Sequence, residues 1–220
     1  MMESLKAIEK IARKLAPGRT PFFTEAHVIK ALEEIEVQGP VGRVKLSKEL
    51  GLGEGPTRTL IRHLKREKLI NISKSGIELS VYGKKLFSTL RAEISEEIEI
   101  PPNPLTVGNF NIAVLVKDGG SAVKYGLEQR DAAIMTGAHG ATTLIFSDNK
   151  LIMPTVTEDI FKDIPLIRDT LLSKLNPREN DVIIIGSAEE KRLAELGAKM
   201  AAFELLKSRS NKMRLHHKTL

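Results

Sequence analysis

Cysteine is absent from the 220-residue sequence. Its absence excludes disulfide bonds, thiolate metal sites and cysteine nucleophiles. The sequence also lacks an apolar run of the roughly eighteen residues that a membrane-spanning helix needs. The first residues alternate charged with apolar side chains, which is unlike a secretory leader. We therefore expect a cytoplasmic protein with no membrane segment.

Recognisable catalytic motifs are also lacking. The sequence contains neither G-x-S-x-G nor H-E-x-x-H, and its adjacent histidines, His216 and His217, lie near the C-terminal end. Asp131 and His139 form only a weak candidate for an acid/base pair, because nothing in the sequence places them together. We expect no catalytic residue, no metal site and no cofactor, so the protein is not predicted to be an enzyme.

Positive charge is concentrated in the first half of the chain and at its C-terminal end. Residues 1–98 contain 18 basic and 13 acidic residues, residues 99–207 contain 12 and 15, and the last thirteen residues contain four and none. Between residues 40 and 85 there are 11 basic and 4 acidic residues. Such a patch neutralises phosphates, although a charged surface is often simply a solvated one.

Three helices are predicted between residues 24 and 69. The first begins after Thr24, the second spans residues 44–50 and ends at Gly51, and the third begins at Pro56, where the first turn of a helix tolerates proline. The third helix separates two faces. Its apolar face carries Leu60, Ile61 and Leu64, and the opposite face carries Thr59, Arg62 and Arg66, flanked by Arg58 and His63.

A β-hairpin is predicted after the third helix. Two short strands, 69–73 and 77–80, are joined by a turn at residues 74–76 and followed by a helix that begins near Tyr82. The order helix, helix, turn, helix, two-stranded wing is that of a winged helix-turn-helix.

The winged helix predicts a DNA-reading surface. Arg58, Thr59, Arg62 and Arg66 supply the bidentate donors and hydroxyls that bases and phosphates require, and Lys74 lies at the wing tip. The alternative is a winged helix used for protein contacts. His63 is expected to be a helix-surface residue rather than a ligand.

Two segments carry a family resemblance. RTLIRHLKREKLI resembles the recognition helix of winged-helix transcriptional regulators, and GIELSVYGKKLF resembles their wing and the helix that follows it. The resemblance covers residues 24–90 and implies that duplex DNA is the partner.

An amphipathic helix precedes the winged helix. It carries Leu5, Ile8, Ile11 and Leu15 and ends at residues 16–18. It is expected either to pair with a second chain in a homodimer, as two-fold operators favour, or to pack on its own domain.

The second half of the chain has the predicted element order β-α-β-β-α-β-α. The fold class is therefore α+β, an N-terminal winged helix followed by an αβ sandwich of ferredoxin-like or related topology with helices on one face. The predicted boundaries are 1–98 for the winged-helix domain, 99–108 for a proline-rich linker, 109–208 for the αβ domain and 209–220 for a basic tail. The αβ domain resembles a domain of unknown function found in uncharacterised archaeal winged-helix proteins.

Residues 129–146 contain the ligand-site candidates, Arg130 and Asp131. A helix that begins at Leu127 would place Asp131 beside Leu127 and Met135, so we expect Asp131 either to cap a shorter helix or to be buried and held by a cation such as Arg130. Ser187 and Glu190 are expected to form a capping box.

The predicted function is a DNA-binding transcriptional regulator whose αβ domain dimerises, senses a small-molecule effector, or both. The alternatives are an enzyme with a winged-helix appendage and a protein-interaction module.

Overall fold

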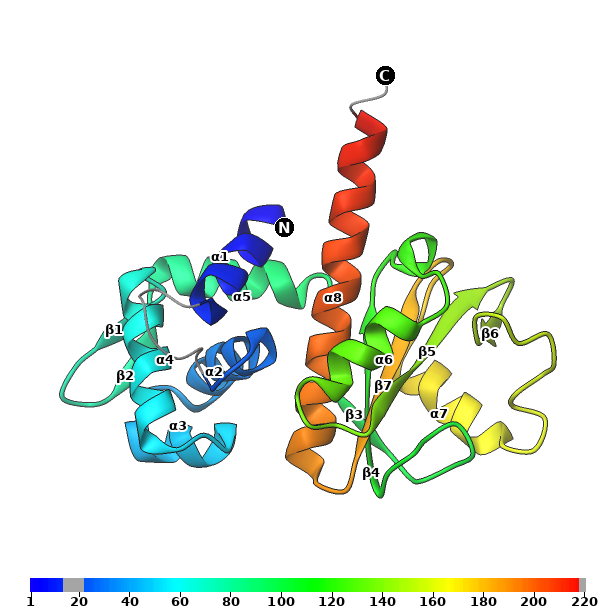
Figure 1. The fold of residues 1–220 in the computed structure, drawn as a ribbon, viewed down its shortest axis with the longest axis horizontal. Helices are drawn as coiled ribbons and strands as arrows, with labels where there is room; N and C mark the ends of the chain where they lie inside the picture. Colours follow the sequence, from blue (N-terminus) through cyan, green and yellow to red (C-terminus); the bar gives the residue numbers. More distant parts are fainter. Residues whose placement is uncertain (14–21, 218–220) are drawn as a thin grey trace. The chain divides into compact units, whose positions relative to one another are not determined.

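The computed structural model describes residues 1–13 and 22–217 and divides into two units, Met1–Ala92 and Glu93–Leu220 (Figure 1). Among the described residues, no helix is both long enough and apolar enough to cross a membrane. The fold class is α+β, as the sequence predicts, with a helical first unit and a second unit built on a sheet.

The first unit contains the predicted winged-helix order of elements. These are α1 (Met2–Ala12), α2 (Glu25–Gln38), α3 (Arg43–Leu50), α4 (Glu54–Arg66), β1 (Ile70–Ile72), β2 (Ile77–Leu79) and α5 (Val81–Arg91). Helix α4 begins before Pro56 rather than at it. Proline is tolerated there because the first four N–H groups of a helix have no intrahelical acceptor.

The core of the first unit is formed by the apolar faces of its helices. Helix α1 contributes Leu5, Ile8 and Ile11, all buried, and packs against α2, α4 and α5, so it packs on its own domain, the second of the two predicted arrangements. Its predicted continuation through Leu15 to residues 16–18 lies outside the described residues.

His63 is buried, and the prediction that it lies on the helix surface is wrong. Its side chain is only 4% exposed, Nδ1 lies 2.8 Å from the carbonyl oxygen of Ile11, and its ring meets Phe23 edge-on. At 100° per residue His63 falls 60° from Leu60, which places it at the edge of the apolar face rather than among the cations.

The wing is fixed by backbone contacts on both sides. Val41 and Ile77 exchange two N–H···O bonds of 3.0 and 2.9 Å, so Val41 adds a short bridge beside the β1–β2 hairpin. Gly83 of α5 lies against the carbonyl of Leu69, where a Cβ atom would be 2.0 Å from that oxygen. The glycine is required because α5 could not otherwise approach the start of β1 so closely.

The second unit contains a five-stranded antiparallel sheet in the order β3-β4-β7-β5-β6. Its elements are β3 (Ile98–Ile100), β4 (Phe110–Val116), the 3-10 turn η1 (Gly120–Ala122), α6 (Leu127–Ile134), β5 (Gly140–Ser147), β6 (Lys150–Ile152), α7 (Pro165–Leu175), β7 (Val182–Ala188) and α8 (Lys191–His217).

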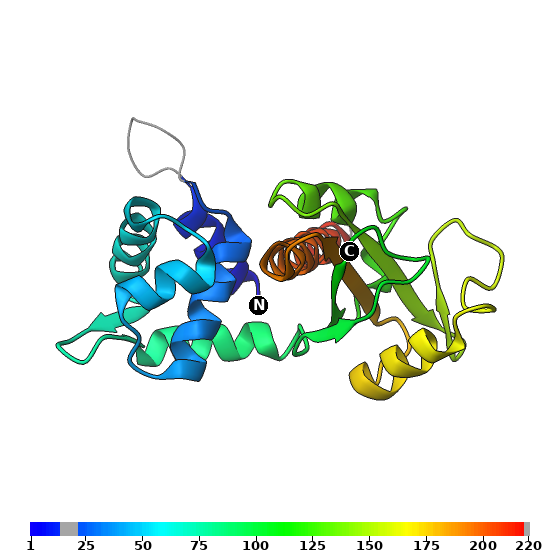
Figure 2. The same ribbon diagram turned by 90° about the horizontal axis from the view of Figure 1, so that it is seen from below.

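The sheet is covered on both faces, which differs from the ferredoxin-like arrangement with helices on one face. Helices α6 and α8 pack on one face and α7 on the other (Figure 2). The central strand β7 pairs with β4 and β5, so the topology is a related one rather than ferredoxin-like. Pairing between strands distant in sequence is not encoded in local periodicity, which explains the difference.

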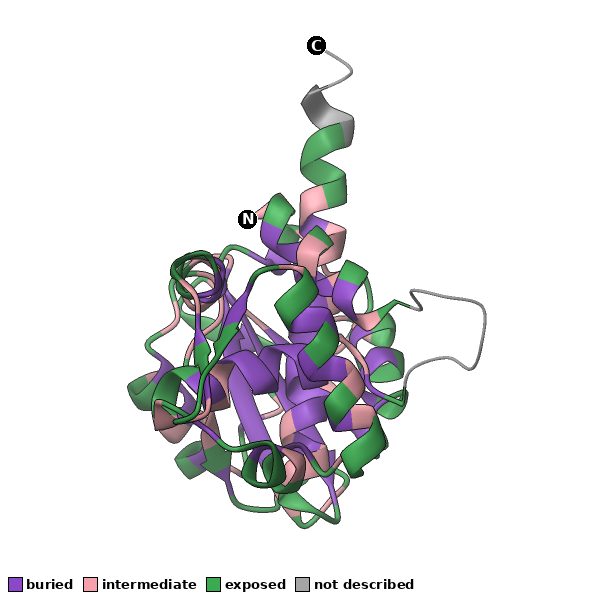
Figure 3. Cartoon of the chain, turned by 90° about the vertical axis from the view of Figure 1, so that its left-hand side faces the viewer, coloured by how far each residue is buried: buried purple, intermediate pink, exposed green. Residues whose placement is uncertain are grey.

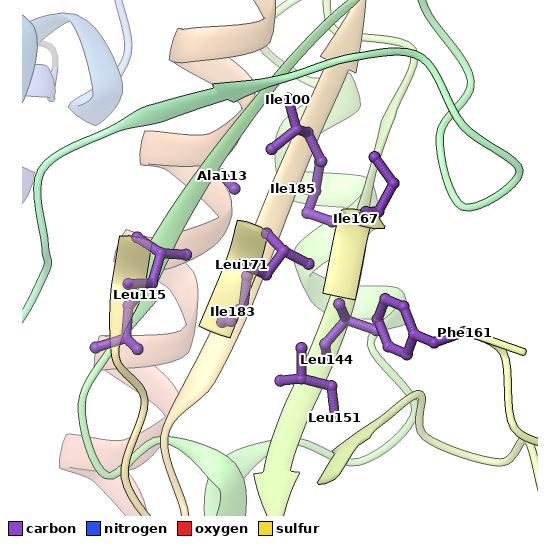
Figure 4. Packing of buried hydrophobic residues seen from close by; sticks show 11 residues of the cluster. Ile100, Ala113, Leu115, Leu144, Leu151, Phe161, Ile167, Leu171, Ile183 and Ile185 are labelled. Atoms are coloured by element: carbon purple, nitrogen blue, oxygen red, sulfur yellow. The ribbon is translucent and has the colours of Figure 1, made fainter. Parts of the chain in front are cut away.

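Each face of the sheet has its own packing. The face toward α7 is a branched apolar core (Figure 4), which contains Ile100, Ala113, Leu115, Leu144, Leu151, Phe161, Ile167, Leu171, Leu175, Ile183 and Ile185. On the other face α8 lies very close to β7, since a Cβ atom at Gly186 would be 2.4 Å from the carbonyl oxygen of Ala194.

The acidic segment 93–99, which runs into β3, is attached to α8 by ion pairs. Glu93, Glu97 and Glu99 pair with Arg209, Lys199 and Lys191. The second unit therefore begins at Glu93, and β3 overlaps the expected linker at residues 99–108.

The expected basic tail continues α8. The helix runs to His217, and its burial gives way to exposure toward the C-terminal end (Figure 3). Arg209, the first residue of the predicted tail, is only 7% exposed and also donates to the carbonyl oxygen of Lys117. It is therefore part of the packed unit rather than of a free tail.

Candidate nucleic-acid interface

Helix α4 presents an uncompensated cationic face. Arg58, Arg62 and Arg66 are exposed, and they lie within 80° of one another around the helix at 100° per residue. Within the part of the chain that the structure describes, none of the three forms an ion pair, although the Nζ of Lys10 pairs with the neighbouring Glu67 at 2.7 Å. Three unpaired guanidinium groups on one face form a surface suited to an anionic partner.

Thr59 lies on the same side of α4 and is half-buried. Its hydroxyl donates to the carbonyl oxygen of Gly55, 3.2 Å away. The oxygen keeps a free lone pair that can accept a further hydrogen bond.

The turn between α3 and α4 sets the orientation of the cationic face. Gly51 adopts the left-handed conformation at φ 62°, and the N–H of Leu52 donates to the carbonyl oxygen of Ser47 at 3.1 Å. The Ser47 hydroxyl donates in turn to the carbonyl oxygen of Leu52. These reciprocal bonds close α3 and start α4 in a fixed direction, which is the geometry that a recognition helix requires.

The wing tip presents Lys74. The N–H of Ser73 donates to the carbonyl oxygen of Gly76 at 2.9 Å, and the hydroxyls of Ser73 and Ser75 lie 2.6 Å apart. Gly76 has a φ of 140°, a conformation that side-chain-bearing residues rarely adopt. The tight turn leaves Lys74 exposed, as the sequence predicts for a residue at the tip.

Lys65 belongs to the same exposed face but was not singled out from the sequence. It is exposed and lies next to Arg58 when α4 is viewed down its axis. The sequence does contain a signal for Lys65, because residues 58, 62 and 65 are spaced by about one helical turn and so share one surface of the helix.

Arg130 and Asp131 lie outside this interface, on α6, and neither predicted arrangement of Asp131 is found. Helix α6 begins at Leu127, so Asp131 is not a cap, and the Asp131 side chain is 62% exposed, so it is not buried. The expected cation is correct, since the Arg130 Nε and Nη2 donate to Asp131 Oδ1 at 3.1 and 2.9 Å.

The reason lies in how α6 packs. Its buried residues are Gln129, Ala132 and Ala133, whereas Leu127 and Met135 are exposed. A Cβ atom at Gly197 of α8 would be 2.6 Å from the Cβ of Ala138 and 3.5 Å from that of Ala133. Near Gly197 the helices are so close that only alanine side chains fit between them, and the larger apolar ones face outward. The face that looked apolar in sequence is therefore the exposed one.

The structure also contradicts the predicted capping box of Ser187 and Glu190, and it weakens the candidate acid/base pair of Asp131 and His139. Ser187 is the penultimate residue of β7 and α8 begins at Lys191, so the capping box with Glu190 is not formed. The Nδ1 of His139 lies 3.1 Å from the carbonyl oxygen of Val107, while Asp131 is bound to Arg130. The structure thus gives His139 and Asp131 separate polar neighbours.

Two cavities lie beside α7 in the second unit. The larger, about 630 Å³, is lined by both apolar and charged side chains, among them Lys150, Ile152, Phe161, Arg168 and Leu172. The smaller, about 500 Å³, shares Asn149 and Leu172 with it. Arg130 and Asp131 line neither cavity.

Comparison with known families agrees with the geometry of the first unit. Residues 27–94 match the model of the CggR N-terminal DNA binding domain. The first unit therefore resembles a regulator-type DNA-binding domain. Residues 107–205 match a domain of unknown function, DUF4443, so the predicted pairing of a winged-helix regulator domain with such a domain is confirmed.

Two individual proteins are similar to this chain. The central glycolytic genes regulator of Priestia megaterium is 31% identical over 94 residues, which is 43% of this chain and only 27% of the regulator. The hypothetical protein PH0730 of Pyrococcus horikoshii OT3 is 28% identical, with a TM-score of 0.65 over 84% of this chain and 99% of that one. The regulator is matched over about a quarter of its length, whereas the solved structure is matched over nearly all of its own.

Proposed function

We propose that this protein is a transcriptional regulator that reads duplex DNA with α4 and the wing. The observation that carries the proposal is the unpaired guanidinium face of Arg58, Arg62 and Arg66 on α4, within a domain that matches a DNA-binding family. The turn that precedes α4 and the wing that follows it are both fixed by hydrogen bonds. The cations are therefore held on a rigid scaffold, which reduces the entropy lost on binding.

The chemistry assigns different roles to these residues. In the major groove the planar guanidinium groups of Arg58 and Arg62 donate two parallel hydrogen bonds to guanine O6 and N7. Arg66, one turn further toward the end of α4, and Thr59 reach phosphate oxygens at the groove edge. Lys74 extends from the wing tip to a neighbouring phosphate or to the minor groove. Phosphate contacts give affinity and base contacts give sequence preference.

The relatives support a role in gene regulation without naming the genes. The Priestia protein is called a regulator of central glycolytic genes, and it is matched over about a quarter of its length. The base-contacting residues, rather than the name of that relative, decide which operators this chain reads. We therefore propose a regulatory role in the cytoplasm and not a catalytic one.

The second unit is proposed to dimerise, to sense an effector, or both. For an effector, the cavity of about 630 Å³ has a size typical of small-molecule sites, and its lining combines apolar side chains such as Phe161 with charged ones of both signs, such as Lys150 and Asp159. Arg130 and Asp131 remain predicted ligand residues but face solvent outside that cavity. Native mass spectrometry of the purified protein, and of an Arg168→Ala variant, tests whether a small molecule is retained in the cavity.

The decisive experiment is selection of genomic DNA fragments by the purified full chain at low salt, followed by titration of the enriched duplexes. Enrichment of a common sequence motif and binding that weakens with salt are expected. Absence of binding to any duplex at low salt would overturn the proposal.

A further inference from the structure

The outward face of α6 is unusually apolar for an exposed helix. Leu127 and Ile134 are each 47% exposed, Met135 is 76% exposed, and Tyr125, just before the helix, is 64% exposed. These four large apolar side chains occur within eleven consecutive residues. Single exposed apolar residues are ordinary, but a cluster on one element marks an interaction site.

This face is apolar for a structural reason. Where α6 meets α8 at Gly197 the inward side chains are small, Ala132 and Ala133, because the backbone of α8 lies directly against them. An ordinary surface helix places its large apolar residues inward and its polar ones outward. Helix α6 does the reverse, which is the arrangement of a helix packed between its own domain and a partner.

The charges on the outward face identify the partner. Arg130 and Asp131 lie between Leu127 and Ile134 along α6, and they form an exposed ion pair within one copy. A pair so exposed contributes little to the stability of a single chain. Leu127 and Ile134 have the same midpoint in the sequence as Arg130 and Asp131. When a second α6 packs antiparallel about a two-fold axis at that midpoint, Leu127 meets the partner's Ile134 and Arg130 meets the partner's Asp131.

We infer that the outward face of α6 is the dimer interface, and that its occupant is α6 of a second copy of this chain. Each carboxylate of Asp131 then lies between two guanidinium groups, and the apolar ends of both helices are removed from water. The two-fold arrangement pairs Arg130 and Asp131 of both copies without a residue from elsewhere. The inference deepens the proposed function by naming the surface that joins two DNA readers, but the interface itself does not depend on DNA.

The test is sedimentation velocity of the full chain over a range of concentrations, with charge variants of the two central residues. Asp131→Arg places cations opposite cations and Arg130→Asp places anions opposite anions, so each variant alone is expected to dimerise roughly a hundredfold more weakly than the wild type. An equimolar mixture of the two variants is expected to recover dimers, because each supplies the charges that the other lacks. Since both residues are exposed, neither change disturbs the core.

Replacing an exposed apolar residue by glutamate tests the apolar part of the interface, with one substitution inside the interface and one outside it as a matched control. Met135→Glu adds a charge to the proposed interface and is expected to weaken dimerisation at least roughly tenfold. Leu166→Glu adds the same charge to α7, on the opposite face of the sheet, where Leu166 is 80% exposed, and is expected to leave the dimer unchanged.

Two outcomes would overturn the inference. A wild-type chain that stays monomeric at every concentration would mean that α6 is not a self-association surface. A dimer that persists in Asp131→Arg and Met135→Glu would mean that two copies meet elsewhere.

DNA binding is measured separately, on a duplex with a single half-site. If Asp131→Arg still binds that duplex while dimerisation is unaffected, the interface is wrong and the proposed function stands. If the dimer behaves as expected but no duplex is bound, the interface stands and the proposed function is wrong.

Discussion

At the scale of single residues, the arginines of α4 are the most direct means of testing DNA binding. Arg62→Ala and Arg66→Ala are each expected to weaken binding to a selected duplex by about tenfold or more, because each removes a cation that has no partner in the described structure. For a phosphate contact, the slope of log K against log salt should also fall by about 1. Fluorescence anisotropy at several salt concentrations measures both quantities.

The control is Lys6→Ala, which removes the same charge from an exposed position on α1. It should change neither the affinity nor the slope appreciably. If Arg62→Ala, Arg66→Ala and Lys6→Ala all behave alike, the cationic face of α4 is not the reading surface.

Gly83 should be intolerant of any side chain. Gly83→Ala places a methyl group 2.0 Å from the Leu69 carbonyl oxygen, so the backbone must move, and we expect a loss of about 1 to 3 kcal/mol in the free energy of unfolding. Gly55→Ala is the matched change, since nothing lies within 4 Å of the added carbon on α4. It should stabilise the chain by about 0.5 to 1 kcal/mol. Urea unfolding followed by circular dichroism compares the two variants, and equal effects would contradict the close approach of α5 to β1.

At the scale of elements, the contacts of α8 with the acidic segment 93–99 differ in burial and therefore in energy. Arg209 is 7% exposed and pairs with Glu93, so Arg209→Met leaves a carboxylate and the Lys117 carbonyl group without their donor. We expect a loss of about 3 to 5 kcal/mol in the free energy of unfolding of the second unit. Lys191→Met removes an exposed pair with Glu99 and should cost about 1 kcal/mol or less. If chemical denaturation finds the two losses equal, burial does not distinguish the pairs.

The contribution of Lys191 has a defined pH dependence. Its hydrogen bond to Glu99 and the charge of that carboxylate raise the pKa of Lys191 above its ordinary value near 10.5. Because the folded state holds this proton more tightly than the unfolded state, the contribution is complete at neutral pH and is lost as the pH rises through the raised pKa. The small stability difference between wild type and Lys191→Met should therefore be constant near neutral pH and disappear in strongly alkaline solution. A difference that persists there would show that the charge is not its source.

The elements differ in how well the sequence predicts them. The winged helix could be predicted because its signals are local, namely the apolar spacing of Leu60 and Leu64, the helix-ending Gly51 and the turn at Gly76. Helix α6 begins at Leu127 as the sequence suggests, but the apolar pattern places Leu127 and Met135 in the interior, whereas both are exposed. The close approach of Gly197 on α8, seventy residues away in the sequence, decides that face, and no local pattern reports it.

The candidate site residues show the same difference between local signals, which the sequence contains, and long-range contacts, which it does not. The exposure of Arg58, Arg62, Arg66 and Lys74 follows from helix periodicity and turn chemistry, so their placement was predictable. Ser187 was expected to cap α8, but it belongs to β7, because β4 pairs with β7 as far as Ala188 and β5 pairs with it as far as Ser187. Long-range pairing overrides a local capping signal there.

At the scale of the whole molecule, a dimer formed through α6 predicts a symmetric operator. DNA selected by the full chain should contain two half-sites related by a two-fold axis, with centres about 34 to 36 Å apart or a multiple of that distance. Footprinting on a selected fragment should show two protected half-sites for the wild type and one, at higher protein concentration, for Asp131→Arg. A single protected site for the wild type would indicate that one copy reads the DNA alone.

Strand β7 also determines how the second unit can be observed. It is the middle strand of the sheet, every residue from Val182 to Ala188 is buried, and helices cover both of its faces. Its amide protons can therefore exchange with solvent deuterium only when the entire unit opens. Their exchange rates report the global opening free energy of this unit separately from the winged helix, in the full chain and in the presence of DNA.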